Sequence, residues 1–206
     1  MIALRRVFLF AAALAVTGLA RANEPSVTAW ALALRTNDAV HATFTEARHL
    51  PIRREPLLLT GELRFQADLG LSLHYLTPEE RTVIVDARGV ALRDARGRTK
   101  RAPARSEAAA SAQVLLTMLR FDFDQLDDDF TITGTAPDTE GAWTLNFVPR
   151  PAAARRGLRP VLVQGHAQAI TQLTLAAGEP DEIDIAIDPA ERVPSFDAAA
   201  LSSFFR

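Results

Sequence analysis

Apolar and polar residues alternate through most of the chain after about residue 40. Leu59, Gly61, Leu63 and Phe65 are separated by polar residues, and this period of two puts them on one face of a β-strand. The same pattern predicts strands at 41–45, 59–66 and 71–75, a hairpin over 83–92, and strands at 130–133, 143–147, 160–164, 169–175 and 183–187. We therefore expect about nine strands.

Helical spacing replaces this alternation in two segments. In 23–38 the apolar residues recur every three or four positions, which predicts a short helix. A second helix is expected after Ser106, a good N-cap residue, with Leu115, Met118 and Leu119 on one face. Two or three helices are too few to cover both faces of a parallel sheet.

The strands have one apolar and one polar side, which is typical of an antiparallel sheet with one face in water. A strongly curved sheet of this kind must cover its concave apolar face with the helices or with a ligand. The chain shows no internal repeat. We therefore expect a mainly β protein with a single domain over 23–206.

The first 22 residues have the pattern of an export signal. Arg5 and Arg6 precede an apolar run over 7–19, and Ala20 and Ala22, on either side of Arg21, form a small-x-small cleavage site. Thirteen apolar residues are fewer than the ~20 that span a bilayer. The arginine pair also resembles a twin-arginine signal, but no polar residue precedes it, so general secretion is favoured. Both routes lead out of the cytoplasm, and we expect a periplasmic protein.

The composition excludes several classes of chemistry. The chain has no cysteine, so disulfides, thiol catalysis, cysteine-ligated metals and acylation of the protein on cysteine are ruled out. Its net charge of −2 does not favour nucleic-acid binding. The four histidines lack metal-ligand spacing, and no cofactor site is expected.

Two short motifs carry weak chemical signals. Residues 70–74 begin like the turn that holds a nucleophilic serine, but Ser72 lies within an alternating strand and His74 replaces the final glycine. The acidic run 122–129 lacks the glycine and the distal glutamate of a calcium loop. A strand serine and a solvated turn are the favoured interpretations, with weak calcium binding as the alternative for the run.

Basic residues gather in two segments with proline, 97–105 and 149–160, which we expect to be connectors. On an otherwise acidic protein they could dock an acidic partner or anionic lipid headgroups. The alternative is a pair of solvated loops. The candidate docking residues are Arg98, Lys100, Arg101, Arg155 and Arg156.

The order of the elements resembles the LolA-like family of periplasmic outer-membrane lipoprotein carriers. The residues that carry the resemblance are those of 41–45, Gly61, Leu63 and Phe65 of the second strand, 71–78, 83–86 and 196–199. The resemblance implies an unclosed β-barrel whose concave apolar face is lidded by helices and receives acyl chains. It also implies a monomer that takes its cargo from an inner-membrane exporter to an outer-membrane acceptor. Where the family has an arginine beyond the second strand, this chain has Ala67, so another acylated lipid is an equal candidate for the cargo.

Hydrophobic contact alone can hold such a cargo, because each buried CH₂ contributes ~0.8 kcal/mol. The candidate lipid-binding residues are Leu63, Phe65, Leu71, Leu73, Tyr75, Ile84, Leu115, Met118, Leu119, Trp143, Leu145 and Phe147. A carrier of acyl chains is the first hypothesis, and a lipid sensor of the same fold that does not transport is the second. A lipid hydrolase is disfavoured, since no nucleophile and base are paired.

Overall fold

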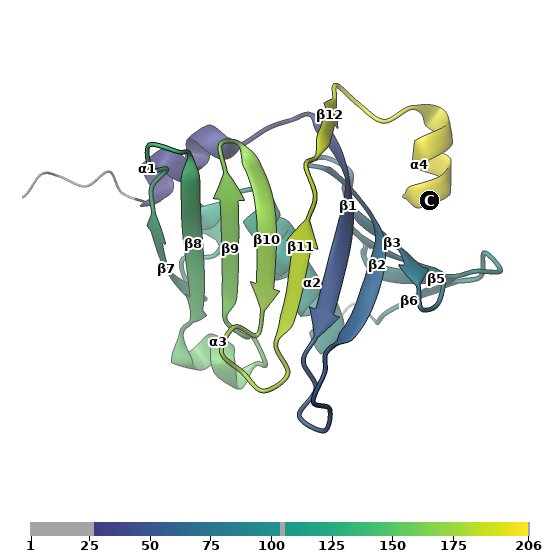
Figure 1. Ribbon diagram of the computed structural model, residues 1–206, viewed down its shortest axis with the longest axis horizontal. Coiled ribbons are helices and arrows are strands. Elements are labelled where there is room, and N and C mark those ends of the chain that lie inside the picture. Colours follow the sequence, from purple (N-terminus) through teal and green to yellow (C-terminus); the bar gives the residue numbers. More distant parts are fainter. Residues whose placement is uncertain (1–26, 104–105, 206) are drawn as a thin grey trace, which may run out of the picture.

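The computed structural model describes residues 27–103 and 106–205 (Figure 1). The export signal predicted for 1–22 lies outside the described residues. The strands are β1 (Ala39–Arg48), β2 (Leu57–Gln66), β3 (Gly70–Thr77), β4 (Arg81–Asp86), β5 (Gly89–Asp94), β6 (Thr99–Arg101), β7 (Phe130–Thr135), β8 (Ala142–Pro149), β9 (Val161–His166), β10 (Ala169–Leu175), β11 (Ile183–Ile187) and β12 (Glu191–Val193). The helices are α1 (Val27–Ala31), η1 (Leu32–Leu34), α2 (Glu107–Leu119), η2 (Phe123–Gln125), α3 (Pro151–Arg155) and α4 (Ala198–Phe204).

All these strands belong to one antiparallel sheet in the order β6-β5-β4-β3-β2-β1-β11-β10-β9-β8-β7, with β12 paired to the start of β1. Two meanders, β1–β6 and β7–β11, meet where β1 pairs with β11. The path ends at β6 and β7, which do not pair with each other, so the curved sheet stays unclosed. The expected fold class is therefore confirmed.

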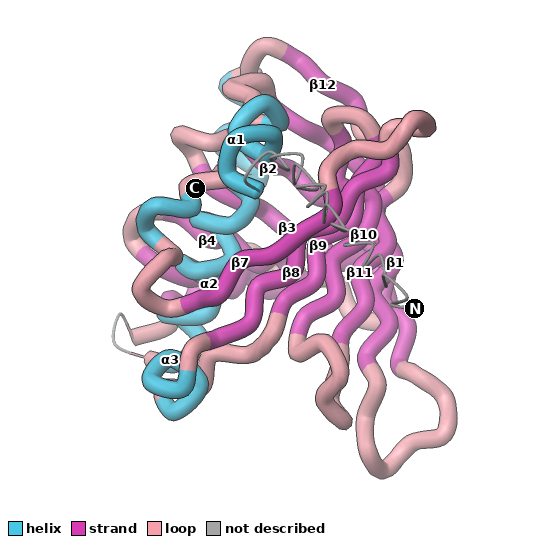
Figure 2. The backbone as a smooth tube through the Cα atoms, turned by 90° about the vertical axis from the view of Figure 1, so that its left-hand side faces the viewer, coloured by secondary structure: helices cyan, strands magenta, loops and turns pink. Residues whose placement is uncertain are grey.

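The concave face of the sheet carries the hydrophobic core. Register places Phe44 of β1 opposite Gly61 of β2 and Ile187 of β11, so side chains of the same parity on neighbouring strands gather on this face. Helix α2 joins the two meanders and covers the face from inside, with Leu116 fully buried (Figure 2). The predicted lid helix over the apolar face is thus present.

The convex face is covered over β2–β5 by the C-terminal helix α4, which lies beside these strands in Figure 1. The guanidinium carbon of Arg64 lies 3.5 Å from the centre of the Phe204 ring. Ile84 of β4 pairs with Ser72 and Ala91, and all three are buried on this side of the sheet. The sequence pattern predicts Ile84 on the concave face, but its strand pairing places it on the convex face.

The two predicted connectors contain regular structure. Residues 99–101 form the short edge strand β6, and residues 151–155 form α3, whose first residue is proline. Proline suits the first turn of a helix because its fixed φ is helical and its missing N–H has no partner there. The expected N-terminal helix is shorter in the described residues, where α1 and η1 end at Leu34. No described helix is long and apolar enough to cross a bilayer.

Substitution of Gly165 is expected to test the tight packing of β8 against β9. A Cβ at this position would lie 2.1 Å from Cζ2 of Trp143 and 2.5 Å from the carbonyl oxygen of Ala169. Because neither backbone nor buried indole can move far, we expect Gly165→Ala to lower the free energy of unfolding by about 2–3 kcal/mol in urea denaturation. In a Trp143→Phe background the clash with Cζ2 is absent, and the same substitution should cost clearly less. Equal costs in both backgrounds would contradict this account.

Candidate functional site

Two apolar cavities open on the concave face at opposite ends of the strands. The upper cavity lies by Val40 near the start of β1, and the lower cavity lies by Arg48 at its end. At ~3.4 Å per residue these two positions are roughly 27 Å apart. Both cavities are bounded by α2 and by strands from both meanders. The concave face therefore has a solvent-accessible hollow on each side of the packed core.

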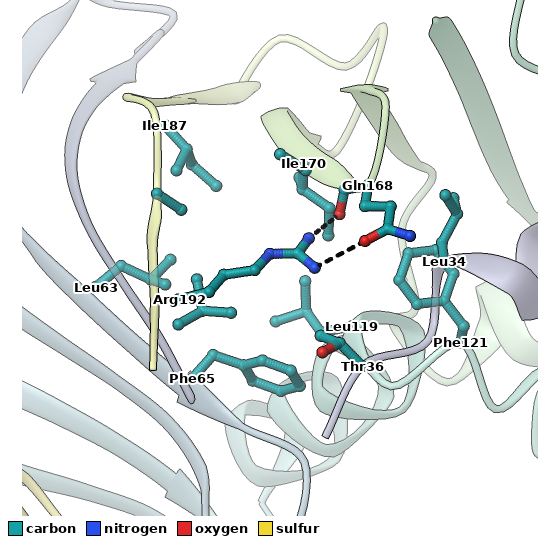
Figure 3. Close-up of a pocket in the computed structure, with 13 residues that line it drawn as sticks. Leu34, Thr36, Leu63, Phe65, Leu119, Phe121, Gln168, Ile170, Ile187 and Arg192 are labelled. Atoms are coloured by element: carbon teal, nitrogen blue, oxygen red, sulfur yellow. Dashed lines mark hydrogen bonds between the residues drawn. The ribbon is translucent and has the colours of Figure 1, made fainter. Parts of the chain in front are cut away.

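The upper cavity has a volume of about 70 Å³. Because one water molecule needs roughly 10–15 Å³ by this measure, it has room for several methylene-sized groups. Figure 3 shows apolar side chains on its walls and the guanidinium of Arg192 reaching across it to Gln168. Its walls are Leu34, Thr36, Val40, Leu63, Phe65, Leu119, Phe121, Gln168, Ala169, Ile170, Ile187, Ala190 and Arg192.

The lower cavity is much larger, about 530 Å³, within the roughly 300–1,000 Å³ range of small-molecule sites. It lies between α2 and the concave face, and apolar side chains dominate its walls. They include Val83 and Val90 of the first meander, Ala112, Val114, Leu115 and Met118 of α2, and Phe130, Leu158, Val161, Leu175 and Ile183 of the second half.

The last turn of α2 separates the two cavities. Met118 lines the lower cavity and its neighbour Leu119 lines the upper one. The helix begins at its N-cap Ser106, whose Oγ accepts a hydrogen bond from Ala109 N at 3.2 Å. Gln113 also donates from Nε2 to the carbonyl oxygen of Asp86 at 2.7 Å. Met118, whose side chain type is flexible, and Leu119 therefore stand between the two cavities.

A buried carboxylate lies on the apolar face between the cavities. Glu46 of β1 is 1% exposed, and its Oε2 accepts a hydrogen bond from the Tyr75 hydroxyl at 2.6 Å. Its Oε1 accepts from Nε of Arg48, which reaches the wall of the lower cavity. Burial, and then the hydrogen bond and negative charge of Glu46, raise the pKa of Tyr75. The phenol therefore stays protonated and keeps donating to Glu46.

Three arginines border the cavities, and they differ in their partners. In the lower cavity Arg48 forms a salt bridge with Glu46, and Nη1 of Arg159 lies 3.2 Å from Oε2 of Glu179. In the upper cavity Arg192 donates from Nη1 to Oε1 of Gln168 at 3.2 Å and from Nη2 to the carbonyl oxygen of the same residue. Within residues 27–103 and 106–205, no carboxylate forms a salt bridge with Arg192.

The structure distributes the predicted lining residues over four locations. Leu63, Phe65 and Leu119 line the upper cavity, while Tyr75, Leu115 and Met118 line the lower cavity. Leu71, Trp143, Leu145 and Phe147 belong to the packed hydrophobic core, and the partly buried Leu73 packs against it. Ile84 faces the convex side. Its neighbour Val83 lines the lower cavity on the concave face, where Ile84 was expected. Lipid contact by any of these residues stays a prediction.

The predicted docking residues are not brought together. Figure 1 places β6 and α3 on opposite sides of the molecule. Three of the five side chains are held by nearby carboxylates: Arg98 by Asp94, Arg101 by Asp86, and Arg156 by Asp129. Docking of a partner through any of the five residues stays a prediction. The two basic segments do not form one continuous patch.

The other candidate chemistry is used within the fold. Ser72 lies inside β3 beneath α4 rather than at a strand-to-helix turn. In the acidic run, Asp122 pairs with Arg35, and Asp129 with Arg156. Among the described residues, one group has the spacing to hold a cation, namely His49, Glu182 and Asp184. Its carboxylates already accept hydrogen bonds from Thr174 Oγ1 at 2.7 Å and from Gly178 N at 2.6 Å.

Most of the wall of the upper cavity carries no recognisable signal in the sequence. Arg192 comes from β12 and Gln168 from the turn between β9 and β10, and neither segment has a pattern that singles it out. Glu46 could have been found. The alternation of Val40, Ala42 and Phe44 puts the next even-numbered residue on the apolar face, where a carboxylate needs a partner.

No protein-family model matches the chain, and no curated protein matches it. Solved structures similar to it include a LolA superfamily protein from Nitrosomonas europaea. That protein is 8% identical, the match covers 84% of this chain and 94% of that one, and the TM-score is 0.45. An outer membrane lipoprotein-sorting protein domain from Vibrio parahaemolyticus is 9% identical over 82% of this chain and 92% of its own, with a TM-score of 0.44.

The complex of MucA and MucB from Pseudomonas aeruginosa contains a chain that is 15% identical over 84% of this one, with a TM-score of 0.46. The present chain spans 57% of the length of that structure's chain. The first two of these similar structures bear LolA or lipoprotein-sorting names.

Proposed function

We propose that this protein is a periplasmic carrier that binds the acyl chain of a lipid or lipoprotein on the concave face of its unclosed sheet. The lower cavity is the observation that supports this proposal most directly. It offers about 530 Å³ between α2 and the sheet, and its walls are mainly aliphatic, as an acyl chain requires. The few polar groups at its edge include two arginines that carboxylates already neutralise.

The energetics of such a site favour reversible binding. A chain of about 16 carbons gains roughly 12 kcal/mol from burial at ~0.8 kcal/mol per CH₂. Association and ordering oppose this gain by an estimated ~4–15 kcal/mol. The net affinity is therefore moderate, and the cargo can leave for an acceptor that binds it more tightly without ATP or covalent chemistry on this protein. The last turn of α2, with Met118 and Leu119, is the element that would shift on entry and release.

Organic extracts of the protein, purified from its native periplasm without detergent, should contain an acylated molecule in near-stoichiometric amount by mass spectrometry. The same protein after delipidation and refolding is the control, because it should yield none. A folded native protein whose extract contains no acylated molecule would contradict the carrier proposal. That outcome would favour a module of the same fold that does not transport.

A further inference from the structure

Arg192 is a cation among apolar side chains. Its Cα pairs with that of Val40 across β12 and β1, which places it on the concave side with the wall of the upper cavity. Around its guanidinium lie Phe65, Ile170 and Leu119 (Figure 3). Its neighbour Glu191 pairs with His41, and because successive strand residues face opposite sides, Glu191 points away from the cavity.

The hydrogen bonds of Arg192 leave much of its binding capacity unused. An arginine has five N–H donors, and Gln168 accepts from two of the terminal nitrogens through neutral oxygens. The arginines of the lower cavity, by contrast, are paired with Glu46 and Glu179. A half-buried guanidinium without a carboxylate partner binds carboxylate or phosphate strongly, through charge-assisted and often paired hydrogen bonds.

We propose that Arg192 binds the anionic headgroup of the cargo, a carboxylate or a phosphate, while the chain behind it lies on the apolar wall of the upper cavity. The inference rests on the proposed acyl-chain carrier and specifies which end of the molecule is recognised. The headgroup sits at the mouth, where Gln168 orients the guanidinium. The first methylenes contact Phe65 and Ile187, and the chain continues past Leu119 beneath the last turn of α2.

The test compares ligands that share one chain and differ in the headgroup. Isothermal titration calorimetry of the delipidated protein would use palmitate, palmitoyl lysophosphatidic acid and hexadecanol, each below the concentration at which it aggregates. We expect both anionic ligands to bind about tenfold more tightly than the alcohol. If only one of the two anionic ligands binds more tightly than hexadecanol, the ratio of the dissociation constants of palmitate and palmitoyl lysophosphatidic acid identifies carboxylate or phosphate as the headgroup.

Arg192→Gln should then weaken binding of the favoured anion about tenfold and leave hexadecanol binding unchanged. Arg93→Gln is the matched control, since Arg93 is a half-buried arginine whose Nη1 donates to the carbonyl oxygen of Ser203 on the convex face. It should change neither dissociation constant. Thermal unfolding of both variants shows that they are folded.

Two results would overturn the assignment of Arg192. One is equal affinity of the wild-type protein for the anions and the alcohol. The other is a loss of hexadecanol binding in Arg192→Gln as large as the loss of anion binding, which would make the residue a structural part of the wall. Failure of the underlying carrier proposal looks different, because then none of the three ligands binds the wild-type protein.

Discussion

Glu46→Ala is expected to lower the free energy of unfolding by about 3 kcal/mol, because it removes the acceptor of the buried Tyr75 hydroxyl and of the half-buried Arg48 guanidinium at once. The Tyr75 hydroxyl and Nε of Arg48 both donate to this carboxylate, which is 1% exposed. The substitution leaves the phenol without a partner and the guanidinium without its counter-charge. Urea denaturation followed by circular dichroism measures the change.

Glu62→Ala is the matched control on the neighbouring strand. Glu62 faces the convex side, its side chain is 30% exposed, and its Oε2 lies 2.9 Å from Nη2 of Arg64. The Arg64 guanidinium also keeps its contact with the Phe204 ring, so removal of Glu62 should cost clearly less, about 1–2 kcal/mol. Combining Glu46→Ala with Tyr75→Phe should cost less than the sum of the two single changes, because they share one hydrogen bond. Strict additivity, or equal costs for Glu46→Ala and Glu62→Ala, would show that the buried network does not stabilise the fold.

The alternation of apolar and polar residues predicts most of the sheet because only one of its faces meets the core along much of its length. In 59–66 every second residue is apolar, and the structure has β2 there with Leu63 and Phe65 on the concave side. The lid helix is equally clear, since Ser106 caps it as expected. These elements follow from local pattern and need no knowledge of distant contacts.

Alternation is lost in strands whose two faces are both covered. Val83, Ile84 and Val85 are consecutive apolar residues, and a run without alternation does not say which side faces the cavity. The side of Ile84 is fixed by α4, more than a hundred residues later in the chain, which covers the convex face of this strand. The sequence does not predict a C-terminal helix on the convex face, which was expected to meet water. The prediction for which residues of β4 face the concave side was therefore wrong.

The candidate site was predictable in kind but only partly in its residues. Six of the predicted lining residues reach a cavity, yet the larger share of both walls comes from segments joined by long-range pairing. Arg192 is the clearest example, because β12 has only three residues and lies on the concave side through its pairing with β1. A strand this short has too few positions to show a period.

A single negative charge in the lower cavity should abolish cargo binding. Leu115 of α2 lines this cavity and is only partly buried, so Leu115→Asp can keep its carboxylate hydrated in the empty protein. An acyl chain entering the cavity would strip that hydration or lose its contact with the helix. We expect the acylated molecule to be absent from organic extracts of the variant, and palmitate affinity to fall at least a hundredfold.

The control is Leu76→Asp, which adds the same charge to a leucine that is 49% exposed on β3 and outside both cavities. It should keep the wild-type amount of extracted lipid. Both variants should unfold within a few degrees of the wild-type protein, since neither position belongs to the fully buried core. Retention of the cargo by a folded Leu115→Asp protein would mean that the chain does not enter the lower cavity. Because this variant leaves Arg192 and the upper cavity untouched, it tests the place of the chain in the lower cavity separately from the contact of the headgroup with Arg192.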